Sequence, residues 1–140
     1  MRRYLVVANR TVGRMHLVYK VRECMAAGPC RFHIVVPASH PIGDLTWTEG
    51  EDRVAAEGRL AEAMARFRES GAIVTGEVGD ASPVEAISDV LRREAFDEII
   101  VSTLPPGFSH WLRQDLPTRV RKQFGLPVHH VVGVEERVSA

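Results

Sequence analysis

A run of polar side chains follows one apolar segment of the sequence, in "VSTLPPGFSHWLRQDLP" at residues 101–117. Ser102, Thr103 and Ser109 carry hydroxyl groups that donate hydrogen bonds to an anion, and Arg10, after another apolar segment, adds a positive charge. Phosphate is the anion that a loop between a strand and a helix N-terminus binds in many parallel α/β proteins. The structural alternative is that the hydroxyls of Ser102 and Thr103 cap and tie down a tight turn at Pro105-Pro106-Gly107. We expect this structural role and keep the polar pocket as the alternative.

The histidines and cysteines have spacings that do not fit a metal site or a catalytic pair. His129 and His130 are adjacent in a predicted strand, so their side chains point to opposite faces of a sheet and cannot share one metal ion. Cys24 and Cys30 match neither a zinc pair nor a redox Cys-x-x-Cys motif, and we expect two reduced thiols. No set of residues combines a nucleophile, a base and oxyanion donors. The sequence therefore predicts a non-catalytic protein with no metal and no cofactor.

The elements that position these side chains alternate between strands and helices along the whole chain. Right-handed connections between buried strands predict an α/β fold, a doubly wound five-stranded parallel sheet with helices on both faces, of Rossmann-like type. We expect a single domain over residues 1–140. The predicted strands are 4–8, 31–37, 72–78, 97–102 and 127–132, and the predicted helices are 15–27, 54–67, 82–94 and about 115–124.

The carboxyl ends of these strands are where a ligand is expected, because doubly wound sheets bind ligands at the point where the strand order reverses. The candidate residues there are Ala8, Asn9 and Arg10 after the first strand, Val36 at the end of the second, and Ser102 and Thr103 at the end of the fourth. The connection over 37–52 is long for a compact domain, which favours a functional or mobile segment.

Helical spacing also predicts which side chains face the core. The first helix should bury the stripe Leu17, Val18, Val21, Cys24 and Met25. The second helix should turn Val54, Ala61, Met64 and Phe67 toward the sheet. The third should begin with Ser82 as its N-cap and Pro83 in its first turn.

The composition excludes several classes of partner. The formal net charge is +0, so no basic field attracts nucleic acid or anionic lipid. No apolar run has the length that a membrane span needs, and the N-terminal apolar run is too short for a signal peptide. We therefore expect a cytoplasmic protein with neither nucleic acid nor membrane as a partner.

Two segments resemble the universal stress protein family: "GDASPVEAISDVLRREAFDEIIVST" (79–103) and "RVRKQFGLPVHHV" (119–131). The resemblance implies a five-stranded doubly wound domain in which the last strand pairs across a homodimer. The residues implied in that pairing are Pro127, Val128, His129, His130, Val131 and Val132. Some members of the family bind ATP, with an Asp at the end of the first strand and a Gly-x-x-Gly-x₉-Gly-Ser/Thr run after the fourth.

The sequence departs from this ATP motif at nearly every position. Asn9 stands in place of the Asp, and Val101 or Ser102 and then Leu104 stand in place of the first two glycines. Gly107 is the one glycine of the loop. The resemblance therefore implies a member that does not bind ATP in the usual geometry, with an adenine nucleotide or a small phosphate compound on a divergent loop as the alternative.

The final Gly-Ser/Thr of the motif is replaced by Gln114 and Asp115. Asp115 is predicted to cap the last helix, with its carboxylate accepting hydrogen bonds from the first backbone N–H groups. A fixed negative charge at that helix end would repel the phosphates of a nucleotide.

Overall fold

The computed structural model describes residues 1–12, 14–38, 49–105 and 109–133, and within them five parallel strands form one sheet in the order β3-β2-β1-β4-β5. The strands are β1 (Arg2–Val7), β2 (Cys30–Pro37), β3 (Val74–Gly79), β4 (Glu98–Thr103) and β5 (Val128–Val132). The predicted doubly wound α/β fold is confirmed, with β3 and β5 as the two edges of the sheet.

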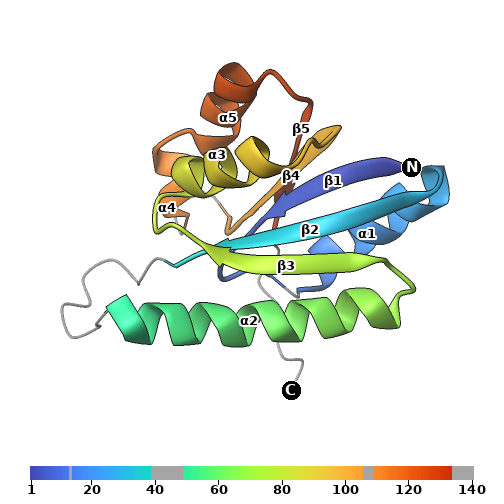
Figure 1. The fold of residues 1–140 in the computed structure, drawn as a ribbon, viewed down its shortest axis with the longest axis horizontal. Coiled ribbons are helices and arrows are strands. Elements are labelled where there is room, and N and C mark those ends of the chain that lie inside the picture. The colour runs from blue at the N-terminus through green and yellow to red at the C-terminus, as the bar shows by residue number, and fades with distance from the viewer. Residues whose placement is uncertain (13, 39–48, 106–108, 134–140) are drawn as a thin grey trace.

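Helices cover both faces of the sheet (Figure 1). The helices are α1 (Met15–Ala27), α2 (Glu49–Glu69), α3 (Pro83–Arg93), the short α4 (His110–Arg113) and α5 (Leu116–Phe124). Side chains from α1 and α2 pack on one face of the sheet, and those from α3 and α5 pack on the other. No helix in the described part of the chain is long and apolar enough to cross a membrane.

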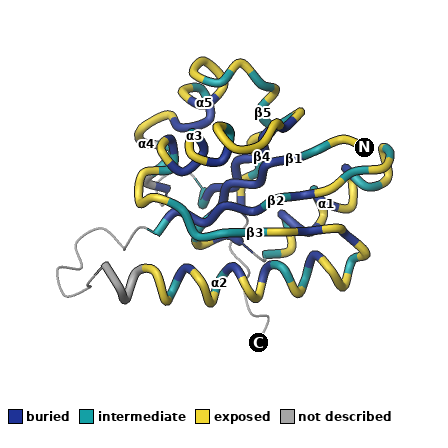
Figure 2. The backbone as a smooth tube through the Cα atoms, viewed as in Figure 1, coloured by how far each residue is buried: buried dark blue, intermediate teal, exposed yellow. Residues whose placement is uncertain are grey.

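Two apolar cores lie on the two faces of the sheet, and Figure 2 shows the buried central strands between them. The core under α1 and α2 is built around three aromatic rings. Tyr4 and Phe32 stack with their ring centroids 5.3 Å apart, and Phe67 meets Phe32 edge-on at 6.2 Å. The core under α3 and α5 is aliphatic for the most part, with Leu5 and Ile87 fully buried.

The predicted core stripe of α2 is wrong in part. Val54 is 68% exposed, and Ala61 is also exposed, whereas Phe67 is buried as expected and Met64 partly so. The side of α2 that faces the sheet instead carries Ala56, Leu60, Ala63 and Phe67. The physical reason lies in the close approach of α2 to β3. A Cβ atom on Gly76 would lie 2.6 Å from Leu60 Cδ1, so glycine at this point of β3 leaves the room that Leu60 of α2 fills.

The other helices follow the sequence signals more closely. The predicted stripe of α1 is buried or partly buried throughout. Ser82 Oγ accepts a hydrogen bond from the N–H of Glu85 at 3.5 Å, and Pro83 begins α3 as predicted. Gly125 ends α5 with a left-handed φ of 68°, the conformation in which glycine is favoured. Helix α4 lies in a stretch predicted as a loop.

Candidate functional site

The switch point of the sheet lies between β1 and β4. Strands β2 and β3 lie on one side of β1, and β4 and β5 lie on the other. Parallel pairing places Val7 beside Val35 of β2 and beside Val101 of β4. The residues that follow these three positions therefore leave the sheet at one level, and this brings the strand-end candidates together.

Ser102 is the centre of a buried polar cluster at this switch point. Its Oγ lies 2.6 Å from Thr11 Oγ1 and 3.0 Å from His16 Nε2. Ser102 and Thr11 are each 1% exposed, and His16 is half-buried in the first turn of α1. The Ser102 hydroxyl is thus bonded on two sides by the protein itself. We call Thr11, His16 and Ser102 the switch-point cluster.

Asn9 is also engaged within the protein. Its Nδ2 donates to the carbonyl oxygen of Pro37 at 3.2 Å, and its Oδ1 accepts from Nη1 of Arg59 at 2.6 Å. The carboxamide therefore links the ends of β1 and β2 to α2. Ala8 and Val36 are fully buried at these strand ends, whereas Arg10 is exposed.

Thr103, the last residue of β4, is held by the strand beside it. Its Oγ1 lies 2.7 Å from His130 Nε2, and its carbonyl oxygen accepts from the N–H of Gly133 at 2.7 Å. Burial lowers the pKa of His130, because the ring is partly removed from water. Gly133 lies close to the switch-point cluster, since a Cβ atom there would be 3.0 Å from His16 Cε1.

Ser109 lies at the start of the short helix α4. It is 4% exposed, and its Oγ accepts a hydrogen bond from the N–H of Leu112 at 3.2 Å, which caps α4. Gly107 lies outside the described residues. Of the candidates beyond α4, Gln114 is exposed and its N–H donates to the carbonyl oxygen of Trp111.

Asp115 stands before α5 as predicted, but its carboxylate does not cap that helix. Its backbone is left-handed, with φ 52° and ψ 47°, and its N–H donates to the carbonyl oxygen of Leu112 at 3.1 Å. Asp115 therefore ends α4 in the left-handed conformation in which many helices end. A side chain that caps the start of α5 would need an extended backbone instead. The prediction that this carboxylate occupies the N-terminus of α5 is wrong.

The remaining strand histidines are paired with neighbouring side chains. His33 lies 2.7 Å from Thr75 Oγ1 and 2.9 Å from Glu77 Oε1, and His129 lies 2.7 Å from Glu98 Oε1. Within the described residues, no group of three His, Cys, Asp or Glu side chains is arranged to hold a metal ion.

The Glu98 carboxylate gives the first testable prediction. Hydrogen bonds from His129 and Arg2 hold the pKa of Glu98 below its ordinary value of 4.5, against the opposing effect of partial burial. Its stabilising contribution is therefore complete above pH 4.5 and is lost as the pH falls through the lower folded-state pKa. Urea unfolding between neutral and acidic pH should show a shallower loss of stability in Glu98→Gln than in the wild type. Equal slopes in the two proteins would contradict this.

Three residues of the site were not anticipated from the sequence: Thr11, His16 and Arg59. The sequence could have indicated Thr11 and His16, because they are polar residues between the end of the first strand and the first turn of the following helix, where ligand sites lie in doubly wound sheets. Nothing in the sequence indicated Arg59, because its contact with Asn9 depends on how α2 lies against the sheet.

Comparisons with known proteins identify the fold. A universal stress protein from Archaeoglobus fulgidus superposes with a TM-score of 0.64 and 19% identity, over 94% of this chain and 93% of that one. A universal stress protein in complex with cAMP gives a TM-score of 0.62 and 18% identity, over 93% and 96% of the two chains. The structure of the universal stress protein from Archaeoglobus fulgidus in complex with dAMP gives a TM-score of 0.61 and 20% identity, over 94% of this chain and 97% of that one. No family profile and no curated protein sequence matches the chain.

Proposed function

We propose that this chain, which has the universal stress protein fold, is a non-catalytic stress-response or regulatory module that works as a homodimer, through interaction or a small ligand, without the usual ATP motif. One observation carries the proposal that the chain does not bind ATP in the usual way. The polar side chains at the switch point are hydrogen-bonded to one another, as Ser102 is to Thr11 and His16, and Thr103 is to His130. A phosphate group would have to displace these internal bonds.

The position of Ser102 supports the absence of an ATP cradle. A glycine at this place would let a nucleotide approach the backbone closely, because it has no side chain. Here the serine side chain fills that space, and the residue is 1% exposed. Asn9, in place of the family's Asp, is likewise held by Pro37 and Arg59.

The proposal of no catalysis rests on the accessibility of the same serine. A serine hydroxyl 3.0 Å from a histidine nitrogen resembles a nucleophile next to its general base. However, Ser102 is buried and its oxygen also contacts Thr11, so a substrate has no path to it in this conformation. We therefore assign the pair a structural role.

Nucleotide titration tests this proposal. ATP, ADP and AMP, each with and without Mg²⁺, should leave the thermal unfolding temperature unchanged at millimolar concentration. A ligand at a hundred times its dissociation constant would add about 2.7 kcal/mol to the free energy of unfolding, which such a measurement readily detects. A saturable rise in the unfolding temperature with any of the three would contradict the proposal.

An adenine nucleotide at the strand ends is the second candidate function. Its specific support is that two of the similar structures are complexes with cAMP and dAMP. Arg10 is exposed beside this region and can supply positive charge to a phosphate. In this alternative Asp115 opposes the phosphates through its charge, so Asp115→Ser should strengthen nucleotide binding. An unchanged or weaker affinity in that variant would count against this role.

The homodimer is proposed to form through β5, which is an edge of the sheet. The carbonyl oxygen of Pro127 accepts from the N–H of Ile99, and the N–H of Gly133 donates to the carbonyl oxygen of Thr103. The odd-numbered residues between positions 127 and 133 therefore turn their backbone N–H and C=O groups toward β4. By alternation, Val128, His130 and Val132 turn theirs away from the sheet. An edge of this kind is a template for pairing with another strand. Antiparallel pairing that uses all three residues centres on His130.

The Val132→Pro substitution tests the β5 dimer. Val132→Pro removes an N–H that faces away from β4, so it should block pairing between copies while leaving the ladder within the sheet intact. Val132→Thr keeps that N–H and is the matched control. Sedimentation velocity should show the wild type and the control at twice the monomer mass of 15.6 kDa, and the proline variant as a monomer. A monomeric wild type at micromolar concentration would refute the pairing.

A cytoplasmic location is also part of the proposal. Cys24 and Cys30 are both free thiols, which is the state expected of cysteines in a reducing compartment.

A further inference from the structure

His130 is the middle residue of β5 and lies at the edge of the sheet where the homodimer is proposed to form. Its backbone N–H and C=O groups turn away from β4, because residues at odd-numbered positions of this stretch bond to that strand. When two copies of β5 pair antiparallel through Val128, His130 and Val132, the central residue has no different partner. His130 then lies directly opposite the same residue of the second copy.

The side chains of the two facing residues lie on one face of the joined sheet. Val128, two residues earlier, packs against the core under α3 and α5, and alternation places the His130 side chain on the same face. The ring is exposed there, and its Nε2 lies 2.7 Å from Thr103 Oγ1. Directly opposite residues of an antiparallel pair have Cβ atoms about 4.5–5.5 Å apart. The two imidazole rings therefore become neighbours across the two-fold axis.

His130 differs from the other two strand histidines in its electrostatic surroundings. His33 lies 2.9 Å from a carboxylate oxygen of Glu77, and His129 lies 2.7 Å from one of Glu98 on the opposite face of the sheet. Among the residues that the structure describes, no ion pair joins His130 to a carboxylate. A positive charge on its ring therefore has no fixed counter-charge.

The helix that packs on this side of β5 does not supply one. The charged residues of α5 are all cations and all exposed, namely Arg119, Arg121 and Lys122. The nearest carboxylate in the chain is that of Asp115, before the first residue of α5, and it is exposed.

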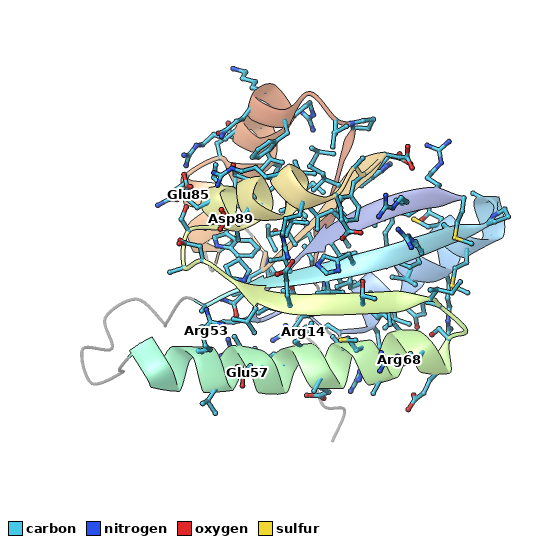
Figure 3. All side chains as sticks on the ribbon, viewed as in Figure 1. Arg14, Arg53, Glu57, Arg68, Glu85 and Asp89 are labelled. Carbon is cyan, nitrogen blue, oxygen red and sulfur yellow. The ribbon has the colours of Figure 1, made fainter. Side chains whose placement is uncertain are left out.

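The other helix on the same face, α3, lies over β2 and β3. Figure 3 shows its carboxylates Glu85 and Asp89 on the side away from β5. Consistent with these positions, burial is the one cause that lowers the pKa of His130.

We propose that the β5 homodimer is a pH-sensitive assembly that separates when the two facing His130 rings are protonated, an inference that rests on the proposed homodimer. Two neutral rings pack against each other at the centre of the pairing. Two imidazolium rings place like charges directly opposite each other, which is destabilising at an interface. In the monomer each ring is exposed to water, which solvates the charge, so protonation favours the separate copies.

Protonation and assembly are therefore linked in a definite direction. The pKa of His130 lies below its ordinary value of 6.5, so the ring is neutral at neutral pH. Pairing removes further water from the ring and adds the second ring, so the pKa in the dimer is lower than in the monomer. The dimer binds fewer protons than two monomers. Association is thus strongest above pH 6.5 and weakens as the pH falls through the pKa of His130.

Sedimentation velocity of the full chain measures this effect. The dissociation constant of the wild type should rise by about tenfold or more between neutral pH and about pH 5. His130→Gln stays neutral over this range, so its dissociation constant should stay constant. His33→Gln, on β2, removes a histidine outside the β5 edge and should keep the wild-type dependence on pH. Circular dichroism at each pH distinguishes dissociation from unfolding.

A charge exchange at position 130 tests the facing arrangement without a change of pH. His130→Lys and His130→Glu should each be monomeric at neutral pH, because each variant places like charges opposite each other. An equimolar mixture of the two should sediment at twice the monomer mass of 15.6 kDa, because the facing charges are then complementary.

The results distinguish a failure of this inference from a failure of the homodimer. A wild type that is monomeric at neutral pH would contradict the homodimer and the inference with it. A wild-type dimer whose dissociation constant does not change with pH would overturn the inference alone. So would a pH dependence that persists in His130→Gln, or a mixture of the two charged variants that stays monomeric.

Discussion

Replacement of Phe67 with alanine should lower the free energy of unfolding by about 3–5 kcal/mol. Phe67, in the last turn of α2, is fully buried, and its ring meets that of Phe32 of β2 edge-on. Truncation removes a large apolar surface from the core and leaves a cavity that the closely packed neighbours of α2 cannot fill. Urea denaturation with a fitted slope, at neutral pH, measures the change.

Val54→Ala is the matched control on the same helix. Val54 is 68% exposed, so its truncation should change the free energy of unfolding by less than about 0.5 kcal/mol. Helical spacing alone predicted that Val54 and Phe67 both face the core. Comparable losses in the two variants would support that sequence pattern and contradict the packing described here.

The contrast between α1 and α2 shows how far the core was predictable. On α1 the buried residues are mostly large and apolar, such as Leu17 and Val21, so spacing identifies the face. On α2 the buried face includes Ala56 and Ala63, and alanine occurs on both faces of this helix. The deciding contact is with Gly76 on another element, and no local pattern contains it.

The candidate site was predictable in its place but not in its bonding. Alternation of strands and helices located the strand ends, and the structure brings Asn9, Ser102 and the end of β2 together there. Backbone conformation was not readable from residue type, because an Asp before a helix usually caps it. Asp115 instead adopts a left-handed conformation because it also ends α4, a helix too short to give a periodic signal.

Ser102→Ala is the second substitution with a large expected effect. It removes the hydroxyl that bonds both Thr11 and His16, and it leaves the Thr11 hydroxyl buried without this partner. A buried polar group that loses its hydrogen bond costs about 1–3 kcal/mol, and the free energy of unfolding should fall by that amount. Chemical denaturation of the variant measures it.

A double-mutant cycle separates this bond from the general effect of truncation. Thr11→Val removes the other hydroxyl and keeps the side-chain shape. The double variant Thr11→Val with Ser102→Ala should be less destabilised than the sum of the two single changes, because the second removal leaves no orphaned group. Strict additivity would show that the two hydroxyls are not bonded in solution, and the switch point would then be open to a ligand.

The most direct test of the closed switch point is an amide NMR titration of the wild-type protein with AMP and with Mg²⁺-ATP. The amide signals of residues 9–12 and 102–104 report on the strand ends, and those of Leu116 and Thr118 report on the N-terminus of α5. With Thr11, His16 and Ser102 bonded to one another, these signals should not move as nucleotide is added at millimolar concentration. Saturable shifts confined to these residues would contradict the central claim and assign the site to a nucleotide.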